Sequence, residues 1–204
     1  FFDSYSKQMA KVIGFVNQKG GVGKTTSTIN VATYLAEAGK KVLLVDLDPQ
    51  GNASSGLGID ARRLEKNLYH AMILGLPTQE LILRTETERL HIVPAAQDLA
   101  GAEIEMVHIE NREFRLHNAI RQVRPYYDYI LIDSPPSLGL LTVNGLVASD
   151  EVIIPVQTEY YALEGLSQLL GTIELVREHL QPNLKIGGAL LTLFDRRNRL
   201  ARQV

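Results

Sequence analysis

The chain has 204 residues, of which 45% are hydrophobic and 22% are charged, so it is suited to one buried α/β core and not to a disordered state. Its net charge of -2 gives no global sign of a nucleic-acid partner, so any such signal must be local. The sequence has no cysteine, which excludes disulfides, thiolate metal sites, iron–sulfur clusters and cysteine nucleophiles.

We expect no signal peptide in the first residues of this sequence. Its first eight residues, FFDSYSKQ, lack the basic and apolar segments of a signal peptide. Met9 is a candidate natural start, and we expect residues 1–10 to be an N-terminal extension of a single domain that covers residues 11–204. No apolar run approaches the roughly 20 residues that a membrane span requires, so we expect a cytoplasmic protein without a membrane partner.

Short β-branched runs alternate with helical patterns along the chain. The sequence predicts strands at 12–16, 41–46, 90–94, 129–133, 151–156 and 185–193, and helices at roughly 24–38, 66–74, 97–124 (one helix or two), 139–148 and 162–180. Several strands are almost entirely apolar, as in parallel sheets that are covered on both faces. The alternation therefore predicts an α/β fold with a doubly wound, mostly parallel sheet and helices on both faces.

A glycine-rich loop joins the first predicted strand to the first predicted helix. Its sequence from residue 17 is NQKGGVGKTT, which matches the phosphate-binding pattern GxxxxGK[ST] except that Gln18 takes the place of the first glycine. Glycines let the backbone turn its N–H groups toward a phosphate, and the helix that follows adds its positive end. The candidate nucleotide-binding residues are Lys19, Gly20, Gly21, Val22, Gly23, Lys24, Thr25 and Thr26.

The side chains of this loop predict distinct roles toward ATP and Mg²⁺. Lys24 is expected to reach the β- and γ-phosphates, Thr25 to bind Mg²⁺, and Thr26 to reach the α-phosphate. The second lysine, Lys19, lies five residues before Lys24 and indicates additional charge compensation at phosphates, including those of a neighbouring subunit. We therefore expect a single P-loop ATPase domain.

Carboxylates at two further strand ends complete the predicted site. Asp133 ends the strand 129–133 and is expected to bind Mg²⁺, directly or through a water. Ser134 follows where many fast ATPases have a glutamate, which predicts slow hydrolysis or a base from elsewhere. Asp48 is the candidate for that role, and Asp46, two residues earlier, is a candidate supporting residue with a structural or a catalytic part.

Taken together, four segments resemble the ParA/Soj family of deviant Walker A ATPases. They are KGGVGKTT (19–26), DLDPQGN (46–52), DSPPSLGLLTVN (133–144) and PVQTEYYALEG (155–165), and the similarity extends over nearly everything from Lys11 onward. The loop 134–139 is the expected sensor of the γ-phosphate, although a rigid turn before a helix is the alternative. In the family the segment that helps to hold the adenine comes later, so we expect this chain to be C-terminally incomplete.

The resemblance implies properties that the motifs alone do not give. ATP binding would produce a face-to-face homodimer in which Lys19 of each subunit crosses to the other's phosphates, and Asp48 would position the attacking water. The ATP-bound dimer would bind double-stranded DNA without sequence preference. A ParB-type partner would stimulate hydrolysis in the cytoplasm, on the nucleoid, during segregation of a chromosome or plasmid.

The basic end of the chain is the candidate DNA surface. It contains Arg196, Arg197, Arg199 and Arg202, of which at least three fall on one helix face. Two such clusters side by side in a dimer would bind phosphates through counterion release. An ordinary solvated helix is the alternative.

Three other functions share parts of this pattern. A MinD-like ATPase that cycles on membranes would need a C-terminal amphipathic helix. A P-loop kinase or ligase for small molecules is disfavoured by Lys19. The nitrogenase iron-protein branch needs cysteine ligands, and this sequence has none.

Overall fold

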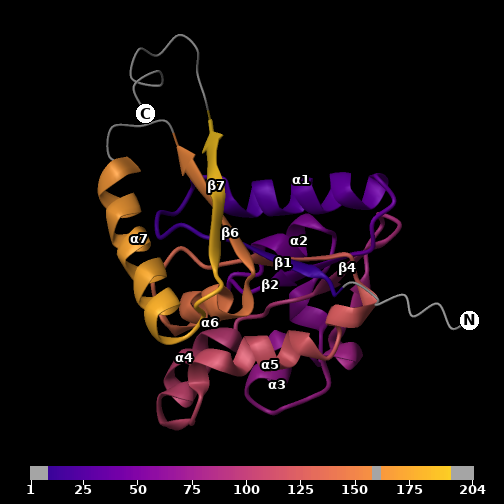
Figure 1. Ribbon diagram of the computed structural model, residues 1–204. Helices are drawn as coiled ribbons and strands as arrows, with labels where there is room; N and C mark the ends of the chain where they lie inside the picture. The colour runs from indigo at the N-terminus through magenta and orange to yellow at the C-terminus, as the bar shows by residue number, and fades with distance from the viewer. Residues whose placement is uncertain (1–8, 158–161, 194–204) are drawn as a thin grey trace, which may run out of the picture.

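The computed structural model describes residues 9–157 and 162–193. One sheet crosses the molecule with the strand order β3-β4-β2-β5-β1-β6-β7 (Figure 1). Its strands are β1 (Lys11–Phe15), β2 (Val42–Asp46), β3 (Leu83–Arg84), β4 (Leu90–Val93), β5 (Tyr129–Asp133), β6 (Glu151–Gln157) and β7 (Lys185–Thr192). Every pair in this sheet is parallel except β3 with β4, which is antiparallel. The predicted mostly parallel sheet is confirmed.

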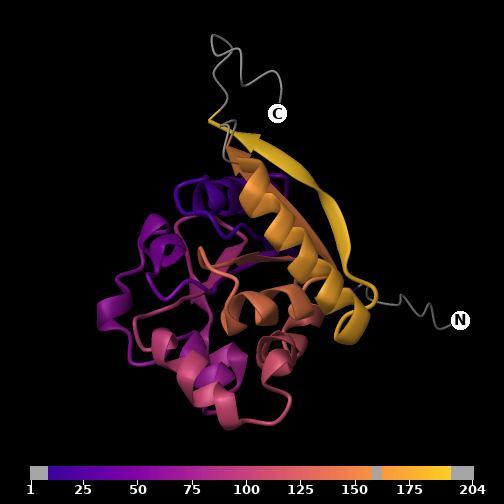
Figure 2. The same ribbon diagram turned by 90° about the vertical axis from the view of Figure 1, so that its left-hand side faces the viewer.

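Helices cover both faces of the sheet. They are α1 (Lys24–Glu37), α2 (Asn52–Gly56), α3 (Leu68–Met72), α4 (Leu99–Glu105), α5 (Arg115–Arg121), α6 (Leu140–Ala148) and α7 (Ala162–His179). Helices α1 and α2 lie on one face and α3 to α6 lie on the other, while α7 runs alongside β6 and β7 (Figures 1 and 2). The doubly wound arrangement is therefore confirmed.

Three apolar clusters hold these helices on the sheet, and one of them packs α7 against β6. On the α1 face, Phe15 and Leu44 pack against Ala32 and Ala36, since the small side chains of α1 allow the helix to approach closely. On the other face, alternate residues of the same strands pack against α3 to α6. The central strands β2 and β5 are thus buried on both sides, as their apolar sequences predict.

The structure refines several predicted boundaries. The helical stretch 97–124 is two α-helices, α4 and α5, separated by short 3₁₀ turns at Met106–His108 and Arg112–Phe114. The two-residue strand β3 and the five-residue helix α2 were not predicted, because elements this short have no measurable periodicity. Within the described ranges, no helix combines the length and hydropathy needed to span a membrane.

Candidate functional site

The glycine-rich loop connects the end of β1 to the start of α1. Gly21 and Gly23 have φ angles of 74° and 81°, a region that side-chain-bearing residues rarely adopt. Gly23 is the N-cap of α1, so the loop turns directly into the helix that carries Lys24. Backbone N–H groups at a helix start, reached through such turns, form an anion-binding concavity.

Asn17 fixes the first residues of this loop. Its side-chain amide is buried, donates to the carbonyl of Pro155 on β6 at 2.7 Å, and accepts from the N–H of Lys19 at 2.9 Å. Gln18 adds a contact to α7, since its Nε2 donates to Oε1 of Gln168 at 2.9 Å. The loop therefore starts from a backbone that is anchored to two neighbouring elements.

Lys24 folds back over the loop from the first turn of α1. Its Nζ donates to the carbonyl oxygen of Lys19 at 3.0 Å, and the residue is only 6% exposed. Burial lowers the pKa of Lys24, while the negative charges of Asp133 and Asp48 oppose that shift. A lysine held in this position, with a carbonyl as hydrogen-bond acceptor, is suited to exchange that acceptor for phosphate oxygens.

Asp133 ends β5 directly beside the loop. The strand register places it opposite Phe15 of β1 and opposite Asp46 of β2. Thr28 donates to its Oδ1 at 3.2 Å, whereas its Oδ2 is buried without a hydrogen-bond partner in the part of the chain that the structure describes. A buried, unpartnered carboxylate oxygen at a strand end next to the Thr25 hydroxyl matches the oxygen ligands and bound waters that Mg²⁺ uses.

The protonation of Asp133 depends on this environment. Burial raises its pKa to about 7, and the charge of Asp46 adds to the rise, while the hydroxyls of Thr25 and Thr28 and the charge of Lys24 oppose it. A cation placed against the free oxygen would favour the ionised form.

Asp48 lies in the loop between β2 and α2 and is 6% exposed. Its Oδ1 accepts from the N–H of Gln50 at 3.0 Å, and its N–H donates to Oδ1 of Asp46 at 3.2 Å. The Asp48 side chain lines the same cavity as Lys24 and Thr25, so the three predicted functional residues converge although 24 positions separate Lys24 from Asp48 in the chain.

This cavity has a volume of about 840 Å³. Its lining includes the glycine-rich loop, the first turn of α1, and the residues Leu190, Leu191, Thr192 and Leu193 at the end of β7. A larger cavity of about 1230 Å³ adjoins it and shares Gln50, but it lacks the glycine-rich loop and Lys24. We assign the nucleotide to the smaller cavity, because the phosphate-binding groups converge there.

Lys19 lines a different cavity from Lys24. A space of about 500 Å³ lies on the α7 side of the loop, between Gln18, Lys19, Pro136, Ser137, Leu138, Gly165 and Gln168. Pro136, in the predicted γ-phosphate-sensing segment, borders both this space and the Lys24 cavity. The two lysines of one loop thus serve different spaces.

Sequence reasoning missed three supporting residues. Asn17 was predicted only as part of the loop, Thr192 donates its hydroxyl to the carbonyl of Val22 at 2.7 Å, and Ser54 binds the carboxylate of Asp46. The last two contacts join elements that are distant or irregular in the sequence, so no pattern could reveal them. The four arginines Arg196, Arg197, Arg199 and Arg202 lie outside the described residues.

A strand, a glycine-rich loop with a buried lysine, a helix, and carboxylates at two neighbouring strand ends define a P-loop nucleotide-binding domain. The family described as "AAA domain" matches residues 10–186. The chain is 56% identical over 196 residues to the chromosome partitioning protein ParA of Myxococcus xanthus, covering 96% of this chain and 69% of that protein. It is 55% identical to the sporulation initiation inhibitor protein Soj of Bacillus subtilis over 196 residues, covering 96% and 78%.

A solved structure extends the comparison to a bound nucleotide. A Mycobacterium smegmatis protein named cobyrinic acid a,c-diamide synthase, with bound ATP analog and magnesium, superposes with a TM-score of 0.92 at 40% identity, covering 95% of this chain and 79% of that one. The chain therefore belongs to the ParA/Soj family of partitioning proteins. It is an ATPase of the P-loop class, whose cofactors are ATP and Mg²⁺.

Proposed function

We propose that this protein is a slowly hydrolysing partitioning ATPase whose ATP-bound homodimer binds double-stranded DNA without sequence preference. Together with a ParB-type protein it would segregate a chromosome or plasmid, in the cytoplasm and on the nucleoid. The names of its relatives at 55 and 56% identity support the partitioning role. The geometry of the site supports separate roles for its residues in phosphate binding, hydrolysis and dimerisation.

In this proposal the glycine-rich loop and Lys24 bind the phosphates of ATP. The N–H groups from Gly20 to Thr26 receive the phosphates, and Lys24 exchanges the Lys19 carbonyl for the β- and γ-phosphates. The Thr25 hydroxyl and Asp133 are the residues that would hold Mg²⁺, which neutralises phosphate charge when bound. Phosphate and Mg²⁺ binding would explain why the buried Lys24 lies near Asp133, whose buried Oδ2 has no hydrogen-bond partner among the described residues.

In this proposal Asp48 is the residue that promotes ATP hydrolysis. It is the carboxylate that lines the Lys24 cavity, and we assign it the orientation of the attacking water. Ser134, after Asp133, is buried with no partner for its hydroxyl among the described residues, and it cannot supply a carboxylate base. Slow turnover follows, because a single orienting group acts without a strong adjacent base.

The proposed dimerisation rests on one observation: the two lysines of the glycine-rich loop, Lys19 and Lys24, line different cavities. Lys19 belongs to the same loop as Lys24 yet lines another space, on the side of α7 and the segment Pro136–Leu138. Lys19 therefore lies outside the cavity to which we assign the nucleotide of its own subunit. Phosphates of a second subunit, brought against this face, would be a strong counter-charge for it.

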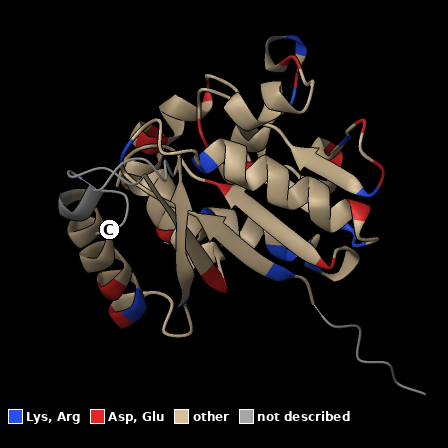
Figure 3. Ribbon diagram, turned by 90° about the horizontal axis from the view of Figure 1, so that it is seen from above, with Lys and Arg blue, Asp and Glu red and all other residues tan. Residues whose placement is uncertain are grey.

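DNA binding is assigned to Arg196, Arg197, Arg199 and Arg202. Figure 3 shows Lys and Arg interspersed with Asp and Glu along the described helices and strands. The dense arginine run near the chain end is then the strongest local basic signal in the sequence. Dimerisation would double the number of phosphate contacts and so couple ATP to DNA binding.

The deciding experiment compares nucleotide states of the same protein. Light scattering should show a monomer with ADP and a dimer with a non-hydrolysable ATP analogue, and only the dimer should shift duplex DNA of arbitrary sequence. The double variant Arg197→Ala, Arg199→Ala should bind every duplex more weakly and with a flatter salt dependence, while its ATP turnover without DNA is unchanged. Binding to liposomes without DNA binding would instead favour the MinD-like function.

The name of the similar Mycobacterium smegmatis protein supports a second candidate, an amide-forming ligase. The cavity of about 1230 Å³ beyond Gln50 is roomy enough for a second substrate. A ligase predicts that cobyrinic acid with an amide-nitrogen donor accelerates ATP turnover and that DNA does not. We favour the partitioning function because the relatives with partitioning names are more similar to this chain in sequence.

A further inference from the structure

The carboxylate of Asp46 lies in the floor of the site but does not reach the cavity. Asp46 is the last residue of β2 and is fully buried, and it is absent from the walls of the 840 Å³ cavity that Asp48 lines. In contrast to Asp133, which has an unpartnered Oδ2 among the described residues, both oxygens of Asp46 accept hydrogen bonds from the protein, so its burial needs no contact with the nucleotide.

The hydrogen bonds of this carboxylate to the described residues run to one short stretch of chain. Its Oδ2 accepts from both the backbone N–H and the hydroxyl of Ser54, at 2.8 and 2.7 Å, and its Oδ1 accepts from the N–H of Asp48 at 3.2 Å. Two of these hydrogen bonds thus hold the start of α2, and the third holds the backbone of Asp48 itself.

Ser54 extends the connection to β4. It is also fully buried, and its hydroxyl oxygen accepts from the N–H of Ala95, just after β4, at 3.2 Å. One hydroxyl therefore joins the ends of two neighbouring strands through α2. This arrangement closes residues 46–54 into a loop whose two ends are held by the same carboxylate.

Asp48 sits inside that closed loop. Its own turn is completed by Gly51, whose N–H donates to the carbonyl of Asp48 at 2.8 Å and whose φ of 64° is left-handed. A Cβ on Gly51 would lie 3.3 Å from the carbonyl oxygen of Ala95, so the loop is packed closely against the segment that Ser54 holds. A shift of Ser54 would be passed to Asp48 through the carboxylate of Asp46, because that carboxylate is hydrogen-bonded to both residues.

We propose that Asp46 and Ser54 are positioning residues that set the orientation of the Asp48 carboxylate for ATP hydrolysis. This inference rests on the proposed role of Asp48 in orienting the attacking water. Because neither residue contacts the nucleotide cavity, their loss changes turnover and leaves nucleotide binding nearly unaltered. A displacement of a catalytic group by about 1 Å can lower a rate by as much as about 100-fold.

The primary test is Ser54→Ala, which removes the hydroxyl and keeps the backbone donor. We expect kcat for ATP hydrolysis to fall by about 10-fold or more while the KM for ATP changes by less than about 2-fold. Ser54→Thr keeps a hydroxyl and restores turnover. Ser55→Ala, the same change at the exposed next residue of α2, is the matched control and leaves both constants unchanged.

A double-variant cycle separates positioning from general destabilisation. In an Asp48→Ala background, Ser54→Ala should have no further effect on kcat, because the group that it positions is gone. If Ser54→Ala lowers the melting temperature but not kcat, or lowers kcat equally in both backgrounds, the positioning role is wrong. If Asp48→Ala itself retains normal turnover, the proposed function of Asp48 fails instead, and the two failures are thus distinguishable.

Discussion

At the scale of single residues, Lys24 is the most constrained charge of the site. Its ammonium group is almost fully removed from water, with one carbonyl oxygen at 3.0 Å and the charges of Asp133 and Asp48 nearby. Desolvation of a cation is costly unless partners offset it. The phosphates of bound ATP would be stronger hydrogen-bond acceptors for the Lys24 ammonium than the Lys19 carbonyl is, so the site favours binding of an anion.

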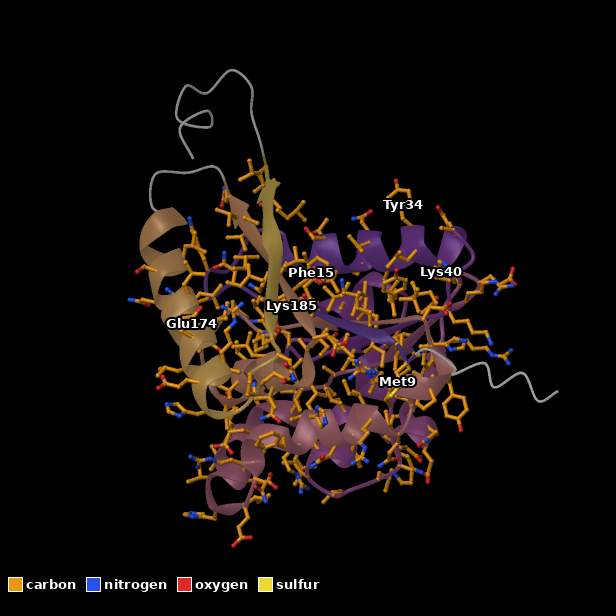
Figure 4. All side chains as sticks on the ribbon, viewed as in Figure 1. Met9, Phe15, Tyr34, Lys40, Glu174 and Lys185 are labelled. Atoms are coloured by element: carbon orange, nitrogen blue, oxygen red, sulfur yellow. The ribbon has the colours of Figure 1, made fainter. Side chains whose placement is uncertain are left out.

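Lys24→Ala is expected to weaken ATP binding by at least about 100-fold, because it removes a charge-assisted contact to the phosphates in a site with little water. Titration with a fluorescent ATP analogue measures the affinity. The control is Lys40→Ala, an exposed lysine just past the other end of α1, which should bind ATP normally (Figure 4). Wild-type affinity in the Lys24 variant would contradict the P-loop assignment.

Two buried carboxyl groups face each other across β2 and β5. Burial raises the pKa of Asp46 to about 6 and that of Asp133 to about 7, from ordinary values of 3.8. Between roughly pH 4 and these values the folded protein holds protons that the unfolded chain has lost. Their contribution to stability is therefore complete at low pH and is lost as the pH rises through about 6 and about 7.

Nucleotide-free protein should consequently lose stability as the pH rises from about 4 to about 7. Asp133→Asn removes one of these titrations, so we expect it to flatten the dependence and to be more stable at about pH 8 by on the order of 1 to 3 kcal/mol. Urea unfolding at several pH values measures this. The same variant should lose the Mg²⁺ dependence of ATP binding. An unchanged pH slope would mean that Asp133 is ionised in the folded protein throughout this range.

At the scale of elements, the site depends on contacts between segments far apart in the chain. The hydroxyl of Thr192, at the end of β7, donates to the carbonyl of Val22, 170 residues earlier. The methyl group of Thr192 also lies 3.5 Å from where a Cβ on Gly23 would be, so β7 supports both the polar and the apolar side of the loop. The glycine-rich loop is thus held from β6, α7 and β7.

Thr192→Val keeps the shape of the side chain and removes its donor. We expect ATP affinity to fall by about 3- to 10-fold, because a net hydrogen bond to the loop contributes about 1 kcal/mol. Thr172→Val is the matched control. It removes a similar hydroxyl-to-carbonyl bond, from Thr172 to Gln168 within α7, and should leave ATP affinity unchanged. If both variants bind ATP alike, the β7 contact does not organise the loop.

At the scale of the whole molecule, the proposed dimer depends on what meets the face that carries Lys19. Lys19→Ala is expected to retain ATP affinity within about 3-fold, since Lys19 does not line the Lys24 cavity. It should reduce the ATP-dependent dimer and, with it, hydrolysis by at least about 10-fold. Light scattering with a non-hydrolysable ATP analogue measures the dimer.

Lys185→Ala, at an exposed lysine at the start of β7, is the control for the change in charge (Figure 4). It should dimerise like the parent protein. A Lys19 variant that forms the ATP dimer normally would exclude the cross-subunit role and leave Lys19 with a function inside its own subunit.

Much of this molecule follows from local sequence rules. The apolar runs at β2 and β5 predict strands buried on both faces, and the glycine, lysine and threonine pattern predicts a phosphate loop at the start of a helix. Asp133 and Asp48 were selected because strand ends of a parallel sheet meet at one edge. Nothing in these steps needs knowledge of distant contacts.

The sequence by itself determined the fold class, the loop and the identity of the candidate catalytic groups, because strand and helix periodicity and loop chemistry are properties of neighbouring residues. Only the tertiary structure decided that Asp46 contacts Ser54 and Asp48 instead of reaching the cavity, and that Lys19 and Lys24 serve different spaces. It also decided that Thr192 holds the loop from β7. These are directions and distances between residues brought together by packing, and no local pattern encodes them.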